Sequence, residues 1–217
     1  MTELNRRKLI QQIGLTTLAA TGVSKVWASE SCQVSLNQTE GPFYPIFQQD
    51  DTDTDLTHVK GRNQMAKGEV ILMNGQVLDS QCRPVKGALV EIWQACESGK
   101  YNHPSDPNPA KLDPNFQYWG RVVSGKNGAF SFKTIKPGAY PATSTWMRPP
   151  HIHVKVNLRG FHELTTQVYF DDEEALNKRD RILMSLPRSE RENVTLKLKG
   201  RSGEIRSGSV TFTLSEI

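Results

Sequence analysis

Two histidines separated by one residue are the feature of this sequence that most directly suggests chemistry. His151-Ile152-His153 follows Pro149-Pro150, which cannot donate helix hydrogen bonds and which favours extended backbone. The run from Ile152 to Val156 is alternating and β-branched, which predicts a strand. Side chains two apart on a strand point to the same face, so both imidazoles could bind one metal ion. The alternative is a pair of partly exposed polar residues on a sheet face.

The elements that must position this pair are predicted to be strands as well. Short apolar runs alternate with turns rich in Gly, Pro, Asn and Asp, which favours an all-β fold, an antiparallel β-sandwich with long active-site loops and one short helix. The helix is expected at about 173–185, and the long loop at 97–118 has a length that is often functional. The strands are expected near residues 69–79, 88–95, 119–124, 129–134, 151–158, 164–170, 193–199 and 208–215.

Length and charge narrow the class of protein further. A chain of 217 residues suits one domain, or one domain with a tail. The formal charge of +4 falls to +1 when residues 1–28 are left out, because that segment carries four basic residues and one acidic residue. No clustered Lys/Arg face is evident in the sequence, so a nucleic-acid partner is not expected.

The first 28 residues are predicted to be a cleavable export signal. Arg6-Arg7 precede a moderately apolar stretch, Leu9 to Val23, which is too short and too polar for a stable membrane span. Val26-Trp27-Ala28 then offers small residues at the usual cleavage spacing, and the paired arginines resemble the twin-arginine signal. We therefore expect a signal peptide at 1–28, a single domain at 29–217, and a periplasmic or extracellular location. The alternative is a frayed basic tail.

Three cysteines and one acidic run are further candidates for covalent or metal bonds. Cys32, Cys82 and Cys96 permit one disulfide in an oxidising compartment, but their spacing does not select the pair. The sequence has no C-x-x-C, which argues against a zinc–thiolate site. The run from Asp50 to Asp55 lacks the glycine and glutamate that a calcium loop requires, so we interpret it as a solvated loop.

Several separate motifs follow one another along the middle of the chain. Their order and gaps resemble those of the intradiol ring-cleaving dioxygenases, especially the protocatechuate 3,4-dioxygenase type, over roughly residues 36–172. The motifs are Thr39-Glu40-Gly41-Pro42-Phe43-Tyr44, Pro84-Val85-Lys86-Gly87-Ala88, Gly99-Lys100-Tyr101-Asn102-His103-Pro104, Leu112-Asp113-Pro114, Lys136-Pro137-Gly138-Ala139-Tyr140, Trp146-Met147-Arg148-Pro149-Pro150-His151-Ile152-His153 and Gln167-Val168-Tyr169-Phe170.

This resemblance implies a metal site and a reaction. It assigns a non-haem ferric ion, Fe(3+), to four ligands: Tyr101, Tyr140, His151 and His153. A trivalent cation can bind a phenol as phenolate, although free phenol has a pKa of about 10, and anionic oxygen is a hard ligand suited to such an ion. The substrates would be a catechol-type diol and O2, and the product a muconate-type dicarboxylate.

The resemblance also implies roles for residues beside the metal. Arg148 would stabilise negative charge on the substrate-derived intermediate, and Gln167 would position Arg148 or the intermediates. Tyr140 would leave the metal when substrate binds and accept a proton. For Arg148 alone, the alternative is a surface arginine beside a strand. His103 and His162 are expected to be loop residues, with His103 near the mouth of the pocket.

The chain departs from its relatives at two places. Pro141 to Thr145 lack the larger aromatic residue of protocatechuate enzymes, which leaves the substrate open, and the helical N-terminal region of catechol 1,2-dioxygenases is missing. Because protocatechuate enzymes share their site between two chains, a homo-oligomer or a related partner chain is expected. Two other interpretations stay open. The chain could be a metal-free β-sandwich that acts as a binding or spacer module, or a degenerate member of the family that binds catechols without cleaving them.

Overall fold

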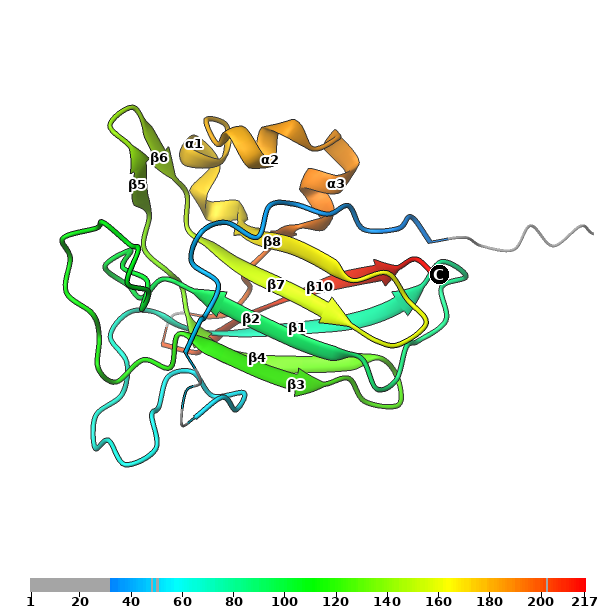
Figure 1. Ribbon diagram of the computed structural model, residues 1–217, viewed down its shortest axis with the longest axis horizontal. Coiled ribbons are helices and arrows are strands. Elements are labelled where there is room, and N and C mark those ends of the chain that lie inside the picture. Colours follow the sequence, from blue (N-terminus) through cyan, green and yellow to red (C-terminus); the bar gives the residue numbers. More distant parts are fainter. Residues whose placement is uncertain (1–31, 48, 50, 202) are drawn as a thin grey trace, which may run out of the picture.

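The computed structural model describes residues 32–47, 49, 51–201 and 203–217 (Figure 1). The predicted export signal at 1–28 lies outside the described residues, so it stays a prediction together with the proposed boundary at residue 29. The centre of the described chain is formed by two stacked sheets, with short helices at one side. The predicted all-β fold class is confirmed.

The smaller sheet has the strand order β10-β1-β4. Along β1, Ile71, Met73 and Val77 are buried between the sheets, which is the alternation expected of a strand with one covered face. The pairing of β1 with β4 is antiparallel, whereas that of β1 with β10 is parallel. Its strands are β1 (Val70–Asp79), β4 (Ala129–Ile135) and β10 (Arg206–Leu214).

The larger sheet has the order β3-β2-β7-β8-β9 and carries the predicted histidine pair on β7. Its pairings are antiparallel except for that of β8 with β9. The pairings of β1 with β10 and of β8 with β9 are the parallel exceptions in this mainly antiparallel sandwich, and both join strands separated by long crossovers. The strands are β2 (Leu89–Gln94), β3 (Trp119–Val123), β7 (His151–Asn157), β8 (Leu164–Phe170) and β9 (Thr195–Leu196).

A short hairpin that was not predicted as strand lies between β4 and β7. It consists of β5 (Tyr140–Thr143) and β6 (Trp146–Arg148), and it extends away from the sandwich (Figure 1). Tyr140 pairs with Arg148 across this hairpin, so its base brings two predicted site residues side by side.

The segment expected as one helix at about 173–185 is split. A 3-10 turn, Asp171–Glu173, leads into α1 (Glu174–Asn177), and α2 (Arg181–Ser185) and α3 (Arg188–Asn193) follow. The break occurs because Asp180 adopts extended backbone and caps α2: its carboxylate accepts the N–H groups of Ile182 and Leu183. In Figure 1 these helices lie beside β8.

An extended segment, residues 32–44, runs along the sandwich from one end to the other, and we call it the N-terminal strap (Figure 1). Its backbone is held by bonds from Ser35 N to Thr213 O (3.0 Å) and from Gln38 N to Thr165 O (2.8 Å). A disulfide joins its first residue, Cys32, to Cys82, while Cys96 is buried as a free thiol. The structure thus supplies the pairing that the sequence left open.

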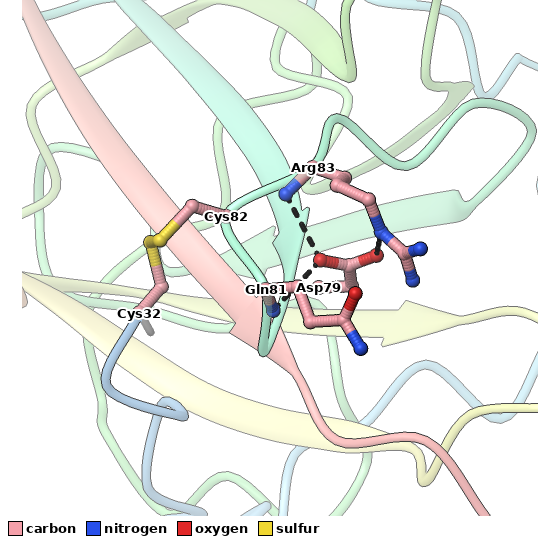
Figure 2. The surroundings of a disulfide bond; sticks show 5 residues. All are labelled: Cys32, Asp79, Gln81, Cys82 and Arg83. Carbon is pink, nitrogen blue, oxygen red and sulfur yellow. Dashed lines mark hydrogen bonds and ion pairs between the residues drawn. A yellow bond between two sulfur atoms is a disulfide. The ribbon is translucent and has the colours of Figure 1, made fainter. Parts of the chain in front are cut away.

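The turn that carries Cys82 is ordered by the carboxylate of Asp79 (Figure 2). Asp79 accepts the N–H groups of Gln81 and Arg83, each at 2.9 Å, and the Arg83 guanidinium at 2.6 Å. Cys82 itself has φ of 61°, a left-handed conformation that costs energy for a residue with a side chain. We infer that the Asp79 contacts help to hold the turn in this shape.

Candidate metal centre

The four residues predicted as ligands are buried and lie together at one end of the larger sheet. Tyr101 Oη is 3.3 Å from His151 Nε2. Ring centroids are 4.9 Å apart for His151 and His153, 5.5 Å for Tyr101 and Tyr140, and 5.6 Å for Tyr140 and His151. Residues from a loop, a hairpin and a strand therefore meet at one point, while their role as ligands stays a prediction.

The histidine pair is positioned by strand geometry and by its neighbours. Ile152 points into the core between the sheets, so His151 and His153 share the opposite face of β7. His153 pairs with Trp93 of β2, and the two rings stack at 4.8 Å. His151 Nδ1 lies 2.7 Å from the carbonyl oxygen of Pro149, which makes Nδ1 the protonated nitrogen and leaves the Nε2 lone pair facing Tyr101.

The tyrosine pair is brought together by a close approach of two loops. Gly99 has φ of 76°, and a Cβ atom there would lie 2.4 Å from the carbonyl oxygen of Ala139. A side chain at this position would push apart the segments that lead to Tyr101 and Tyr140. The backbone N–H of Tyr101 also donates to Asp106 at 2.7 Å, which fixes the start of the long loop.

The donor set fits a hard, highly charged cation. Burial, reinforced by Arg148, lowers the pKa of His153 to about 3 and that of His151 well below its usual value, so both imidazoles are neutral, as metal binding requires. Burial also raises the pKa of Tyr101 and of Tyr140, with Arg148 partly opposing the shift. The phenols would therefore need a strong positive charge beside them to ionise, and a trivalent ion would provide it.

A metal site built only from His, Cys, Asp and Glu side chains is not found in the described part of the chain. No group of three or more His, Cys, Asp or Glu residues gathers there in a way that could hold a metal ion. His103 accepts the N–H of Ser105 and contacts Phe43, and His162 is exposed beside Ser215. Among the described residues, no contact joins either histidine to the four predicted ligands, and His103 is not among the residues that line the pocket beside them.

Arg148 is buried beside the four donors, which excludes the alternative of a surface arginine. It is 4% exposed, and its Nε donates to Asp180 at 2.7 Å. One terminal nitrogen donates to Gln167 at 2.6 Å and to the Tyr169 hydroxyl at 3.3 Å. Gln167 in turn donates to the carbonyl oxygen of Thr39 at 2.9 Å. Gln167 is therefore well placed to orient Arg148.

Asp180 and Tyr169 belong to this network but were not predicted from the sequence. Asp180 is fully buried and carries the charge that balances Arg148. Its signal in the sequence was only that of a helix N-cap, an aspartate two residues before Ile182. Tyr169 looked like an ordinary strand aromatic, and its hydroxyl contacts, to Arg148, Gln167 and Gln38, depend on the assembled fold.

A pocket of about 280 Å³ opens beside these residues. The N-terminal strap forms one wall, where the Phe43 ring packs against the Tyr101 ring at a centroid distance of 4.8 Å and a tilt of 34°. The long loop, the β5–β6 hairpin and α2 form the others. Its lining residues are Thr39, Gly41, Pro42, Phe43, Asp106, Pro107, Tyr140, Pro141, Ala142, Trp146, Arg148, His153 and Ile182. The size suits a small organic molecule.

No helix among the described residues is long and apolar enough to cross a membrane.

Residues 39–214 match the protein family described as Dioxygenase. The chain is 38% identical over 159 residues to the protocatechuate 3,4-dioxygenase beta chain of Burkholderia cepacia, a match that covers 70% of this chain and 67% of that one. It is 32% identical over 120 residues to hydroxyquinol 1,2-dioxygenase of Rhizobium sp. (strain MTP-10005), which covers 49% of this chain but only 39% of that relative.

Solved structures show the same arrangement. The dioxygenase domain of a dioxygenase–carbohydrate-binding fusion protein from Streptomyces sp. SirexAA-E has a TM-score of 0.62 and 27% identity, covering 85% of this chain and 100% of that one. An intradiol ring-cleavage dioxygenase from Tetranychus urticae has a TM-score of 0.66 at 22% identity, covering 85% of this chain and 95% of that one, and it supports the fold alone.

Proposed function

Because this chain belongs to the intradiol ring-cleaving dioxygenases, we propose that it binds ferric iron and uses O2 to cleave a catechol between its two hydroxylated carbons. The observation that carries the proposal is the meeting of two buried phenols, two neutral imidazoles and a buried arginine beside one small pocket. Both oxygen atoms of O2 would end in the product, a muconate-type dicarboxylate.

Tyr101, Tyr140, His151 and His153 would hold the iron. When bound, ferric iron would hold the two oxygens of the diol and make the ring reactive toward O2. Tyr140 lines the pocket, so its phenolate can accept a proton that the diol loses as it binds. Tyr101 is more deeply placed, at 2% exposure, and is suited to a permanent ligand role.

Arg148 would act on the charge that develops on the substrate during ring cleavage. Its guanidinium is held on one side by Asp180 and on another by Gln167 and Tyr169, so it needs no rearrangement when that charge appears. The apolar walls of the pocket reduce screening by water and so strengthen this interaction. Gln167 and Asp180 would act through Arg148 as positioning residues.

The proposal is tested by colour, iron content and one tyrosine substitution. The purified protein should contain one ferric ion per chain and absorb visible light through phenolate-to-iron charge transfer. Tyr140→Phe should lose part of that absorption and bind substrate more slowly, whereas Tyr44→Phe should retain the native spectrum, because Tyr44 packs on Trp93 outside the donor set.

Each other interpretation predicts a different result. A metal-free binding or spacer module would be colourless and iron-free after expression with ample iron. A degenerate member would be coloured and would bind catechols without consuming O2. An unchanged visible spectrum in Tyr140→Phe would remove Tyr140 from the ligand set.

We further propose that the protein is exported by the twin-arginine route and works outside the cytoplasm. The disulfide between Cys32 and Cys82 supports this, because such bonds persist in oxidising compartments. N-terminal sequencing of periplasmic or secreted protein should find residues 1–28 removed. An intact Met1 on cytoplasmic protein would contradict the proposal.

We also propose that the chain assembles with a second copy or with a related chain. Among its relatives are the beta chain and the alpha chain of protocatechuate 3,4-dioxygenase, and each such name implies a multi-chain enzyme for that relative. Light scattering on the purified protein, with and without a co-expressed related chain, distinguishes these assemblies from a monomer.

A further inference from the structure

The pocket beside the candidate metal centre carries little free charge. Apart from His153, the only ionisable acid or base side chains among its described lining residues are Asp106, Tyr140 and Arg148. The charge of Arg148 is balanced by Asp180 at 2.7 Å. Asp106 is 8% exposed and accepts backbone N–H groups, with Lys100 3.8 Å away and outside the lining. A negatively charged ligand group would therefore meet no unpaired cation in this lining.

The remaining walls are mainly apolar and come from four different segments. Phe43 belongs to the N-terminal strap, Pro107 to the long loop, Ala142 and Trp146 to the β5–β6 hairpin, and Ile182 to α2. These side chains offer contact area but no hydrogen-bond donor for a carboxylate, except for the indole N–H of Trp146. The volume of about 280 Å³ has room for one aromatic ring with a modest substituent.

One further arginine lies near the pocket but not in its lining. The guanidinium of Arg181 lies over the Trp146 ring, 5.3 Å from its centroid, and its residue is exposed. Water screens an exposed charge strongly, so this guanidinium would attract a buried anion only weakly. Arg181 therefore adds no cation to the pocket lining.

From these observations we propose that the site selects a single-ring catechol whose ring substituent is uncharged, and that it discriminates against a ring carboxylate. This inference rests on the proposed function and adds a substrate class to it. A carboxylate on the ring would lose its water against apolar walls, and it would face no cation of the lining except Arg148, whose charge Asp180 already balances. Discrimination therefore comes from the penalty on the charged substrate as much as from attraction of the neutral one.

The test compares two substrates that differ in charge and hardly in size. Oxygen uptake by the iron-loaded protein gives kcat/KM for 3,4-dihydroxybenzamide and for 3,4-dihydroxybenzoate, with 4-methylcatechol as the apolar reference. We expect the amide and the methyl compound to exceed the carboxylate by about tenfold or more, because an unsatisfied buried polar group is penalised on roughly that scale. A carboxylate that reacts as well as the amide would overturn the inference.

A charge placed in the pocket wall provides an independent check. Ile182→Lys should raise the ratio of carboxylate to amide kcat/KM by about tenfold, whereas Ile182→Met, of similar length but uncharged, should leave the ratio unchanged. An unmoved ratio in a folded, iron-loaded Ile182→Lys variant would contradict electrostatic exclusion. If none of the three catechols is consumed, the proposed function is wrong. If the catechols are consumed but the carboxylate is preferred, only the inference about substrate charge is wrong.

Discussion

Asp180 supports both the arginine of the candidate site and the start of a helix, and the two tasks can be separated. One carboxylate oxygen accepts Arg148 Nε at 2.7 Å. The other accepts the N–H groups of Ile182 and Leu183 at 3.1 and 2.8 Å. Asp180→Asn keeps an oxygen for the cap but removes the charge, whereas Asp180→Ala removes both.

The expected losses follow from burial. Asp180 is fully buried and Arg148 is 4% exposed, so removing one charge leaves the other unpaired in a medium of low polarity. Breaking such a pair costs about 3–5 kcal/mol of unfolding free energy. Asp180→Asn should therefore lose at least about 3 kcal/mol, and Asp180→Ala about 1 kcal/mol more for the lost cap.

Urea unfolding of four proteins measures the pair directly: the parent, Asp180→Asn, Arg148→Met and the double variant, at matched metal content. Each single variant leaves one buried charge without its partner, whereas the double variant removes both charges. The double variant should therefore be more stable than the sum of the single losses predicts, by about 3 kcal/mol. Losses that simply add would refute the assignment of Arg148 and Asp180 as a buried ion pair.

Two further predictions concern the end of the sandwich that carries the disulfide. Replacing Cys32 and Cys82 by serine should lower the unfolding free energy by up to about 4 kcal/mol, which is the loop-closure value for a separation of 50 residues. Dithiothreitol should destabilise the parent but not this variant, and a parent melting temperature that is the same with and without dithiothreitol would contradict the prediction. Burial favours a raised pKa for Asp79, but its bonds from Arg83 and Gln81 outweigh burial and hold the pKa below its usual value. The parent should therefore be more stable than Asp79→Asn by the full amount above about pH 5, and this difference should decline as the pH falls below about 4. Urea unfolding across this pH range measures the difference, and a difference that grows on acidification would contradict the lowered pKa of Asp79.

The strands and the histidine pair were predictable because they depend on local pattern. Alternation of burial along Val70–Asp79 reflects one covered face, whereas Leu164–Phe170 is a mostly buried strand. The order of the motifs along the chain is enough to assign all four proposed ligands. The hairpin at Tyr140–Arg148 was missed because Pro141 lies inside a four-residue strand, where proline argues against strand.

Other features depend on distant partners and leave no local trace. Nothing in the spacing of three cysteines distinguishes Cys82 from Cys96 as the partner of Cys32, since the choice follows from where the turn after β1 lies. The parallel pairing of β1 with β10 joins segments more than 120 residues apart. Likewise, Asp180 reads as a helix cap, and only the assembled fold brings Arg148 against it.

The N-terminal strap is synthesised before the residues that hold it in place, so it must fold later than its position in the chain suggests. Ribosomes produce residues 32–44 early, but the groups that hold the strap come much later: Thr165 and Thr166 are 127 and 128 positions beyond Gln38, and Thr213 is 178 beyond Ser35. Until these partners emerge, Phe43 cannot close the pocket over Tyr101. Contacts of such long range form slowly. The candidate pocket is therefore among the last parts of the molecule to take shape, although the strap residues that form one of its walls are among the first of the described chain to be synthesised.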